Sequence, residues 1–247
     1  MELVTPGLVL REVKLGEADR ILTILTPEHG VLSVSAKGSL RLKSKLFSAC
    51  GLFCYSEFTL FAGKTIHQVN DAQVIKVFFG LRERMEATAL AMYMAEIAMA
   101  LNPMGKEADT QLRLLLNSLY LLSENKKDIR QIKAVYELRS VCEAGYRPDL
   151  LCCQSCHAYD GGSFYFDPLA GVLLCGDCCA RQNRAPNLDG AALTALRHIA
   201  LVEDQKVFSF AIPPQSLAQL GRVTQAYALR HLDKPMKTLD FLTAMLA

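Results

Sequence analysis

The strongest constraint in this sequence is a pair of Cys-x2-Cys doublets separated by 18 residues. Each doublet can present two thiolates from one tight turn, and two such turns meeting across a hairpin supply the four soft ligands that Zn²⁺ binds tetrahedrally. The segment between them has hairpin character, because Gly161-Gly162 and Asp167-Pro168 bracket an aromatic, strand-like run. The spacing predicts a zinc site whose ligands are Cys153, Cys156, Cys175 and Cys178.

Two neighbouring thiols, Cys152 and Cys179, compete for the same positions, and His157 is a more distant candidate. We favour the x2 pairs because their turns aim backbone amides at the sulfurs. Four protein ligands leave no position for water or substrate, so the zinc is expected to be structural. Two other interpretations stay open, namely reduced core cysteines and a dithiol redox centre, which would need only one Cys-x-x-Cys pair.

The length of 247 residues predicts two or three compact units, and an apolar content of 51% is ample for their cores. The N-terminus lacks the basic start and apolar run of a signal peptide, so we expect a cytoplasmic protein with reduced or metal-bound cysteines. The longest apolar stretch, residues 87–101, is interrupted by Glu96 and is too short to cross a bilayer. It is interpreted as a buried helix.

The small net charge of +2 is unevenly distributed. Residues 1–80 carry nine Lys and Arg against seven Asp and Glu, whereas residues 81–150 and 151–247 are balanced. Within the first third, residues 31–56 contain no acidic side chain and carry four cations, Lys37, Arg41, Lys43 and Lys45. Together with two hydroxyls and a glycine, these cations suit a sugar-phosphate backbone. The alternative is a solvated connection, as most charge runs are.

Five runs rich in Val, Ile, Thr and aromatic residues predict strands in the first 80 residues. They cover 8–13, 20–25, 31–35, 53–61 and 65–77. Five short strands in this length indicate an OB-type β-barrel, although the pattern alone does not exclude an SH3-type barrel. Five aromatic residues near the basic run are candidates for base stacking, with only one or two expected to be exposed: Phe47, Phe53, Tyr55, Phe58 and Phe61.

Helical periodicity replaces the strand pattern after Gly80. Apolar residues recur at helical spacing over 81–101, 107–122 and 128–144. Further helices are predicted from a cap at Asn187 or Asp189 up to Val202, from Pro213-Pro214 to about residue 232, and over 237–246. We therefore predict an α+β multidomain protein, with an OB-type nucleic-acid-binding domain at 1–80 and an α-helical domain at 81–247. A zinc-finger-like module with four cysteine ligands, at 150–182, is inserted in the helical domain and interrupts it.

The helical region offers a possible site for an acidic peptide. Five methionines cluster between residues 85 and 104, which fits an adaptable apolar groove but fits core filling better. Six cations flank the third helix and could form a basic rim: Lys126, Lys127, Arg130, Lys133, Arg139 and Arg147.

No catalytic motif is found in the sequence. There is no P-loop, no Gly-x-Ser-x-Gly, no His-Glu-x-x-His and no dinucleotide fingerprint, and the five histidines are scattered. We therefore expect a protein that is not an enzyme.

Several short motifs occur in a fixed order along the chain. They are Gly7–Glu12, Gly16–Thr23, Thr26–Gly30, Ala36-Lys37-Gly38 with Lys43-Ser44, Glu137-Leu138-Arg139 with Gly145–Pro148, and the cysteine quartet. Their succession over the whole length resembles the RecO family of bacterial recombination mediators. The sequence departs from many members at Ser39-Leu40, where they carry further cations.

The resemblance implies an N-terminal OB-fold, a helical domain and a zinc-finger-like insertion. It also implies binding to single- and double-stranded DNA, strand annealing, and loading of RecA with the partner RecR onto strands covered by single-stranded-DNA-binding protein. The acidic C-terminal tail of that covering protein is an implied partner. The expected location is the bacterial cytoplasm, at the nucleoid. Two other classes stay open, a protein-only adaptor with a scaffold barrel and a thiol oxidoreductase that uses one Cys pair.

Overall fold

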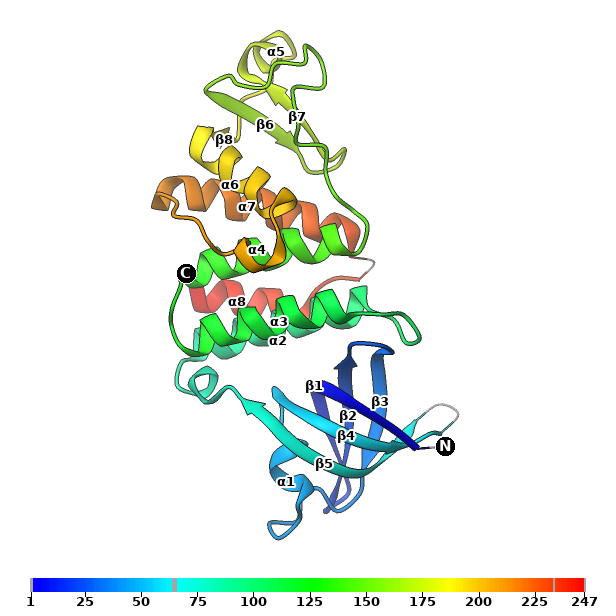
Figure 1. Cartoon of the computed structure of the whole chain (residues 1–247). Coiled ribbons are helices and arrows are strands. Elements are labelled where there is room, and N and C mark those ends of the chain that lie inside the picture. Colours follow the sequence, from blue (N-terminus) through cyan, green and yellow to red (C-terminus); the bar gives the residue numbers. More distant parts are fainter. Residues whose placement is uncertain (1, 64–65, 233, 247) are drawn as a thin grey trace. The chain divides into compact units, whose positions relative to one another are not determined.

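The computed structural model describes residues 2–63, 66–232 and 234–246. Internal contacts group the chain into two compact units, Met1–Glu124 with Lys237–Ala247 (unit 1) and Asn125–Met236 (unit 2) (Figure 1). The mixed α+β class is confirmed. This grouping by contacts does not test the predicted domains, which are 1–80 and 81–247 with an insertion at 150–182. They therefore stay predictions.

Unit 1 begins with a closed barrel in which the strands lie in the order β1-β2-β3-β5-β4. The strands are β1 (Glu2–Leu15), β2 (Asp19–Thr26), β3 (Gly30–Ala36), β4 (Cys54–Phe61) and β5 (His67–Val77). The first and fourth close the barrel through antiparallel pairing from Glu2 opposite Phe61 to Leu8 opposite Tyr55. Only β3 and β5 pair in parallel, over a short register that includes Val34 opposite His67.

Alternating burial explains why these segments form strands. In β3, every second residue from Gly30 to Ala36 is buried, and β4 follows the same two-residue period. The inward side chains form one core that includes Leu22, Ile24 and Phe58, all fully buried. The five predicted strands are all found, but β1 begins earlier than expected. The predicted start of the fifth strand, Thr65, lies outside the described residues.

The turn between β2 and β3 is fixed by a close backbone approach. Gly30 has a φ of +64°, and a Cβ atom there would lie 2.5 Å from the carbonyl oxygen of Pro103. The amide of Val31 donates to the carbonyl of Asn102 at 3.1 Å, and the amide of Ala108 donates to that of Pro27 at 2.7 Å. Only glycine fits this position, because both the backbone conformation and the space exclude a side chain.

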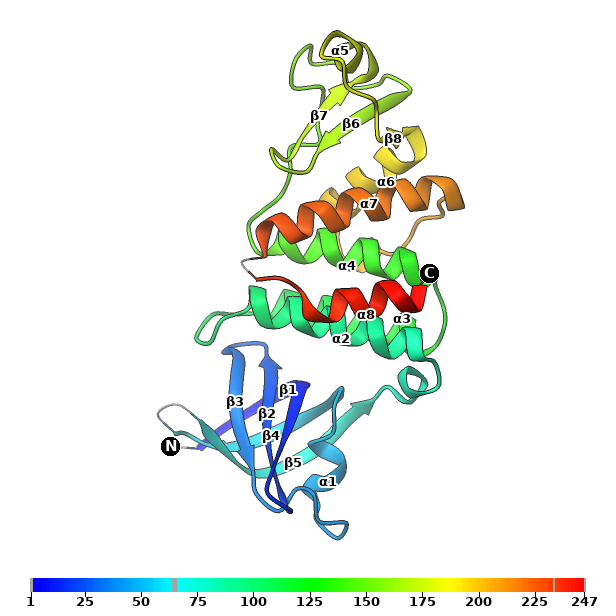
Figure 2. The same ribbon diagram turned by 180° about the vertical axis from the view of Figure 1, so that it is seen from behind.

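Helices complete unit 1: η1 (Phe79–Arg82), α2 (Met85–Leu101), α3 (Asp109–Ser123) and α8 (Lys237–Leu246), with the short α1 (Leu46–Ala49) in the barrel. The last helix returns from the end of the chain to lie beside α2 (Figure 2). The carboxylate of Glu96 caps it, accepting from the amides of Lys237 and Thr238 at 3.1 and 2.9 Å. No helix in the described part of the chain is long and apolar enough to cross a membrane.

Unit 2 is built around the helices α4 (Ile129–Glu143), α6 (Gly190–Leu201) and α7 (Pro214–His231). The starts of the last two follow the sequence signals: Asp189 caps α6 by accepting from the amide of Ala192 at 2.8 Å, and α7 opens at Pro213-Pro214. A three-stranded sheet in the order β7-β6-β8 and a short helix α5 form the rest. Their bounds are β6 (Ser163–Asp167), β7 (Val172–Cys175), β8 (Leu188–Asp189), α5 (Gly176–Arg181) and η2 (Asp204–Lys206).

The α4 helix is buried from Gln131 to Cys142, so its charged residues need partners inside the protein. The ammonium of Lys133 lies 2.6 Å from the fully buried carboxylate of Glu137, which also accepts from the hydroxyl of Thr224 at 3.1 Å. Arg139 donates to the carbonyls of Ile199 and Val202 and pairs with Glu143 and Asp204. The proposal that Lys133 and Arg139 form part of a basic rim is therefore wrong, because both are buried and paired.

Removing one member of the buried pair in α4 should be costly. We expect Lys133→Met to lower the free energy of unfolding by about 3–5 kcal/mol, because the carboxylate of Glu137 loses its ammonium partner. The double variant Lys133→Met, Glu137→Leu should recover most of this loss, since two packed apolar side chains leave no buried charge without a partner. Urea denaturation of the three proteins measures both effects.

Lys206→Met is the matched control, because Lys206 pairs with Glu203 at 3.0 Å on the surface. Its stability should change by no more than about 0.5 kcal/mol. Equal effects of the two lysine substitutions would contradict the assigned role of the buried pair.

Candidate metal centre and basic loop

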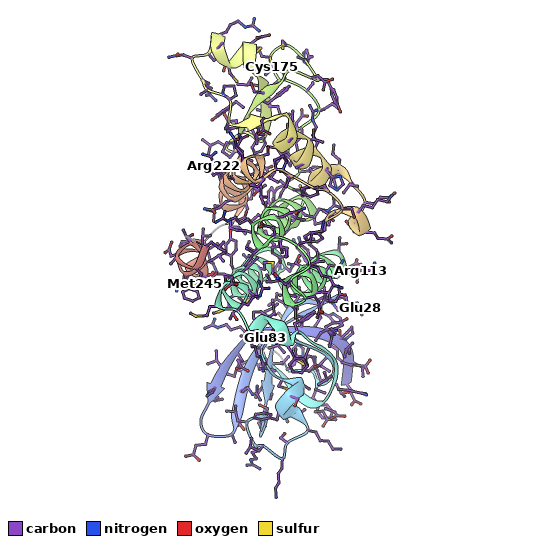
Figure 3. All side chains as sticks on the ribbon, turned by 90° about the vertical axis from the view of Figure 1, so that its left-hand side faces the viewer. Glu28, Glu83, Arg113, Cys175, Arg222 and Met245 are labelled. Atoms are coloured by element: carbon purple, nitrogen blue, oxygen red, sulfur yellow. The ribbon has the colours of Figure 1, made fainter. Side chains whose placement is uncertain are left out.

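Four cysteine thiols meet at one end of the sheet of unit 2. Cys153 and Cys156 lie in the loop before β6, Cys175 ends β7 and Cys178 lies in α5 (Figure 3, where Cys175 is labelled). Their sulfur atoms all lie within 4.8 Å of one another. Four thiolates at such separations can surround a single ion of the size of Zn²⁺, so the donor set fits a tetrahedral metal site.

Backbone hydrogen bonds shape the first Cys-x2-Cys turn. The amide of His157 donates to the carbonyl of Cys153 at 2.8 Å, and the amide of Cys153 donates to that of Ala158 at 2.9 Å. The turn closes through a left-handed backbone conformation at His157, where φ is +61°. The amide of Gln154 donates to the carbonyl of Leu173 at 2.8 Å, which joins this turn to β7 and thereby to the second pair.

The electrostatics of the cluster favour thiolates at Cys153 and Cys178 and oppose one at Cys156. Burial raises the pKa of Cys153, but hydrogen bonds from the backbone amides of Cys175, Cys156 and Ser155 outweigh this effect and lower the pKa to about 6. The pKa of Cys178 is also lowered, chiefly by a hydrogen bond from the hydroxyl of Ser155. For Cys156, the backbone amide of Ala158 lowers the pKa, yet the three neighbouring sulfurs raise it to about 12. Several thiolates this close repel one another, and a divalent cation relieves that repulsion.

The two competing thiols do not join the cluster. The side chain of Cys179 is buried, and its thiol donates to the carbonyl of Leu174 at 3.6 Å. The sulfur of Cys152 lies 3.9 Å from Nδ1 of His157. Neither Cys152 nor His157 belongs to the cluster of four cysteines. The structure thus brings together the four residues predicted from the spacing.

Two arginines that the sequence did not single out support this centre. Arg181 donates from Nη2 to the sulfur of Cys178 at 2.8 Å. Arg197, on α6, donates to the carbonyls of Leu150, Leu151 and Tyr159 at 2.8, 3.1 and 3.0 Å. Its guanidinium also lies 4.2 Å from the centroid of the Tyr159 ring. This side chain therefore fixes both ends of the segment that carries the first cysteine pair.

In unit 1, the predicted phosphate-binding residues lie on the connection from β3 to α1, which we call the basic loop (residues 37–45). The side chains of Lys37, Arg41, Lys43 and Lys45 are all exposed. Across residues 2–63, 66–232 and 234–246, none of them forms an ion pair with a carboxylate. Four cations without an internal counter-charge are available to an external anion.

A buried guanidinium holds the basic loop in place. Arg20 is 5% exposed, and its nitrogens donate to the carbonyl of Ser39 at 2.7 Å, that of Phe47 at 2.9 Å and that of Cys50 at 3.0 Å. Its charge is balanced by Glu12 at 2.9 Å. One side chain on β2 therefore binds backbone carbonyls before and after Arg41, Lys43 and Lys45.

Hydrogen bonds to the turn before β2 and to the first residue of β2 add to this anchor. The amide of Leu40 donates to the carbonyl of Ala18 at 2.9 Å, and the amide of Gly38 donates to the carboxylate of Asp19 at 2.7 Å. These bonds link the basic loop to the motif Gly16–Thr23, so that motif has a structural role in positioning the cations.

The aromatic candidates divide by burial. Phe53 and Phe58 are buried, whereas Phe47 and Phe61 have exposed fractions of 40% and 48%. Phe47 directly follows the basic loop, and its ring centroid lies 5.6 Å from the guanidinium carbon of Arg20. Of the five aromatics, Phe47 is thus the one beside the cations with an exposed face.

Comparison with known proteins decides the family. The family model described as "Recombination protein O N terminal" matches residues 1–78, and the one described as "Recombination protein O C terminal" matches residues 82–240. The chain belongs to the RecO family. It is 37% identical over 241 residues to DNA repair protein RecO of Acetivibrio thermocellus, covering 98% of this chain and 96% of that protein.

Other RecO relatives are matched over a similar length. DNA repair protein RecO of Dehalococcoides mccartyi is 32% identical, with 98% of this chain and 95% of that protein covered. DNA repair protein RecO of Desulforudis audaxviator is 30% identical, with 98% and 96% covered. Membership of the RecO family supports a role in DNA repair and recombination.

The four-cysteine cluster leads to a metal prediction. We expect purified protein to contain about one zinc ion per chain, and Cys175→Ser to reduce this to near zero, because three thiolates bind the ion far more weakly. Metal analysis after gel filtration measures the content, and circular dichroism reports the loss of structure in unit 2.

Cys152→Ser and Cys179→Ser are the controls, since neither sulfur belongs to the cluster. Both should keep about one ion per chain. Loss of zinc from either control together with retention in Cys175→Ser would overturn the ligand assignment.

The anchor of the basic loop leads to a second prediction. Arg20→Lys keeps the positive charge but cannot reach three carbonyls at once, so we expect a loss of about 2–4 kcal/mol in the free energy of unfolding. Amides of residues 38–47 should exchange with deuterium faster than in the wild type. Arg11→Lys, an exposed position on β1, should leave both quantities unchanged. Unaltered exchange of the loop amides in Arg20→Lys would argue against the anchor.

Proposed function

We propose that this RecO chain is a non-enzymatic DNA repair and recombination mediator that binds single- and double-stranded DNA and anneals complementary strands. The observation that carries this proposal is the basic loop, whose four exposed cations form no ion pair with a carboxylate in the described part of the chain. Family membership supports the choice of DNA as the polyanion, since the relatives are named DNA repair proteins.

The barrel is proposed to be of the OB type. Its strand order, β1-β2-β3-β5-β4 with closure between β1 and β4, supports this assignment over an SH3-type barrel. The boundary between the two family models, at residues 78 and 82, likewise supports domains at 1–80 and 81–247. In such barrels, a groove with cations and exposed aromatic rings is the usual surface for single strands.

The mechanism requires no covalent step. Lys37, Arg41, Lys43 and Lys45 would hold the sugar-phosphate chain, while Phe47 offers a ring face to a base. Because the cations neutralise phosphates and leave base edges free, two complementary strands held this way repel each other less and can still pair. Binding through phosphates is sequence-independent, which suits a protein that must act at any damaged site.

The cysteine cluster is proposed to hold a structural Zn²⁺ through Cys153, Cys156, Cys175 and Cys178. Four thiolate ligands supply no open position, so the ion would join the two Cys-x2-Cys turns and stabilise the module at 150–182. A thiol oxidoreductase is less well supported, because two Cys pairs lie together where one would suffice.

The proposed partners rest on family membership. They are RecR, the acidic C-terminal tail of single-stranded-DNA-binding protein, and RecA, whose loading the complex would assist. The protein would act at the nucleoid in the bacterial cytoplasm, where these partners meet DNA.

A salt titration tests the proposal. We expect the combined variant Arg41→Ala, Lys43→Ala and Lys45→Ala to reduce the slope of log K against log salt by up to about three, one for each lost phosphate contact. The measurement is fluorescence anisotropy of a labelled single strand at several ionic strengths.

The matched control removes three exposed arginines from unit 2, with the substitutions Arg147→Ala, Arg222→Ala and Arg230→Ala. This control has the same net charge as the test variant and should keep the wild-type slope. An unchanged slope in the basic-loop variant would remove this loop from the mechanism, and no binding by the wild type even at low salt would favour a protein-only adaptor.

A further inference from the structure

The most exposed large apolar side chain in the described part of the chain lies among the cations of the basic loop. Leu42 is 86% exposed, more than Leu169 at 75% or Phe79 at 69%. Its chain neighbours, Arg41 and Lys43, are both exposed. An apolar side chain directed into water has no role in the fold of the free protein, because it buries almost no surface there.

The turn that carries Leu42 is ordered by its own backbone. The amide of Arg41 donates to the carbonyl of Gly38 at 3.1 Å, and the amide of Ser44 donates to the carbonyl of Arg41 at 2.8 Å. The hydroxyl of Ser44 accepts from the amide of Leu46 at 3.2 Å. Together with the contacts of Arg20 to Ser39 and Phe47, these bonds fix the backbone on both sides of Leu42. The backbone that carries the Leu42 side chain is therefore held at a defined position.

The charges around Leu42 indicate what it meets. Arg41 and Lys43 form no carboxylate ion pair among the described residues, so a bound polyanion would place phosphates against both. A side chain between two such contacts would face the sugars and bases that lie between the phosphates. Apolar side chains of this size are known to enter between neighbouring bases and unstack them.

We propose that Leu42 is a wedge that inserts between adjacent bases of a single strand bound to the basic loop, a role that rests on the proposed DNA binding. The insertion would unstack the strand and present separated bases for pairing. It would also add an apolar contribution to affinity that does not depend on salt, unlike that of the flanking cations.

A labelled strand that contains 2-aminopurine tests this role, because the fluorescence of this base rises when it is unstacked. We expect wild-type protein to raise the signal on binding, and Leu42→Ala to abolish most of that rise while weakening binding by about fivefold. The salt slope of Leu42→Ala should equal that of the wild type, since no phosphate contact is lost. Leu42→Phe should restore the signal, because a ring can also enter between bases.

Leu169→Ala is the matched control, since Leu169 is similarly exposed but lies in unit 2 on the turn between β6 and β7. It should behave as the wild type. If the triple basic-loop variant lowers the salt slope but Leu42→Ala unstacks the strand as fully as the wild type, the wedge is refuted and DNA binding stands. If Leu42→Ala instead loses only binding to a protein partner, the side chain serves that partner and the wedge is likewise refuted.

Discussion

The hydrogen bonds from Arg20 to the carbonyls of Ser39, Phe47 and Cys50, which flank Arg41, Lys43 and Lys45, are the interaction on which the proposed DNA surface depends. A loop without regular structure has backbone groups that must find partners, and one guanidinium with five donors can satisfy several of them at once. Because this guanidinium is itself buried, Glu12 is needed to balance its charge. Arg197 serves unit 2 in the same way, through the carbonyls of Leu150, Leu151 and Tyr159. In each unit, one arginine positions the segment that carries the candidate site.

The charges of this RecO chain therefore fall into two groups with different physical roles. Lys133, Arg139 and Arg20 are buried, and each has a carboxylate within hydrogen-bonding distance, as the cost of burying a charge requires. The cations of the basic loop are exposed and have no such partner among the described residues. Counting charges along the sequence could not separate these two groups. Burial distinguishes residues that support the fold from those available to a ligand.

Much of the fold followed from local patterns. The period of two in β3 and β4, the cap of α6 and the prolines at the start of α7 were sufficient to predict those elements, because each is set by residues close in sequence. The cysteine quartet was predictable for the same reason, since its spacing alone defines two turns. The carbonyl partners of Arg20 were not, because they lie 19 to 30 residues away and only the folded barrel brings them together. The return of α8 to Glu96, 142 residues earlier, is equally invisible in the sequence.

The rigidity of the basic loop bears on how a mediator can release its strand. Cations held by a fixed backbone lose less conformational entropy on binding than cations on a mobile loop, so fewer of them are needed for a given affinity. On the proposed function, four contacts of this kind, each sensitive to salt, would give binding that is selective for a polyanion yet readily reversed. A strand that has paired would then have to leave the protein, and so few salt-sensitive contacts would allow its release. On the proposed function, Arg20 therefore determines both how the strand is bound and how easily it departs.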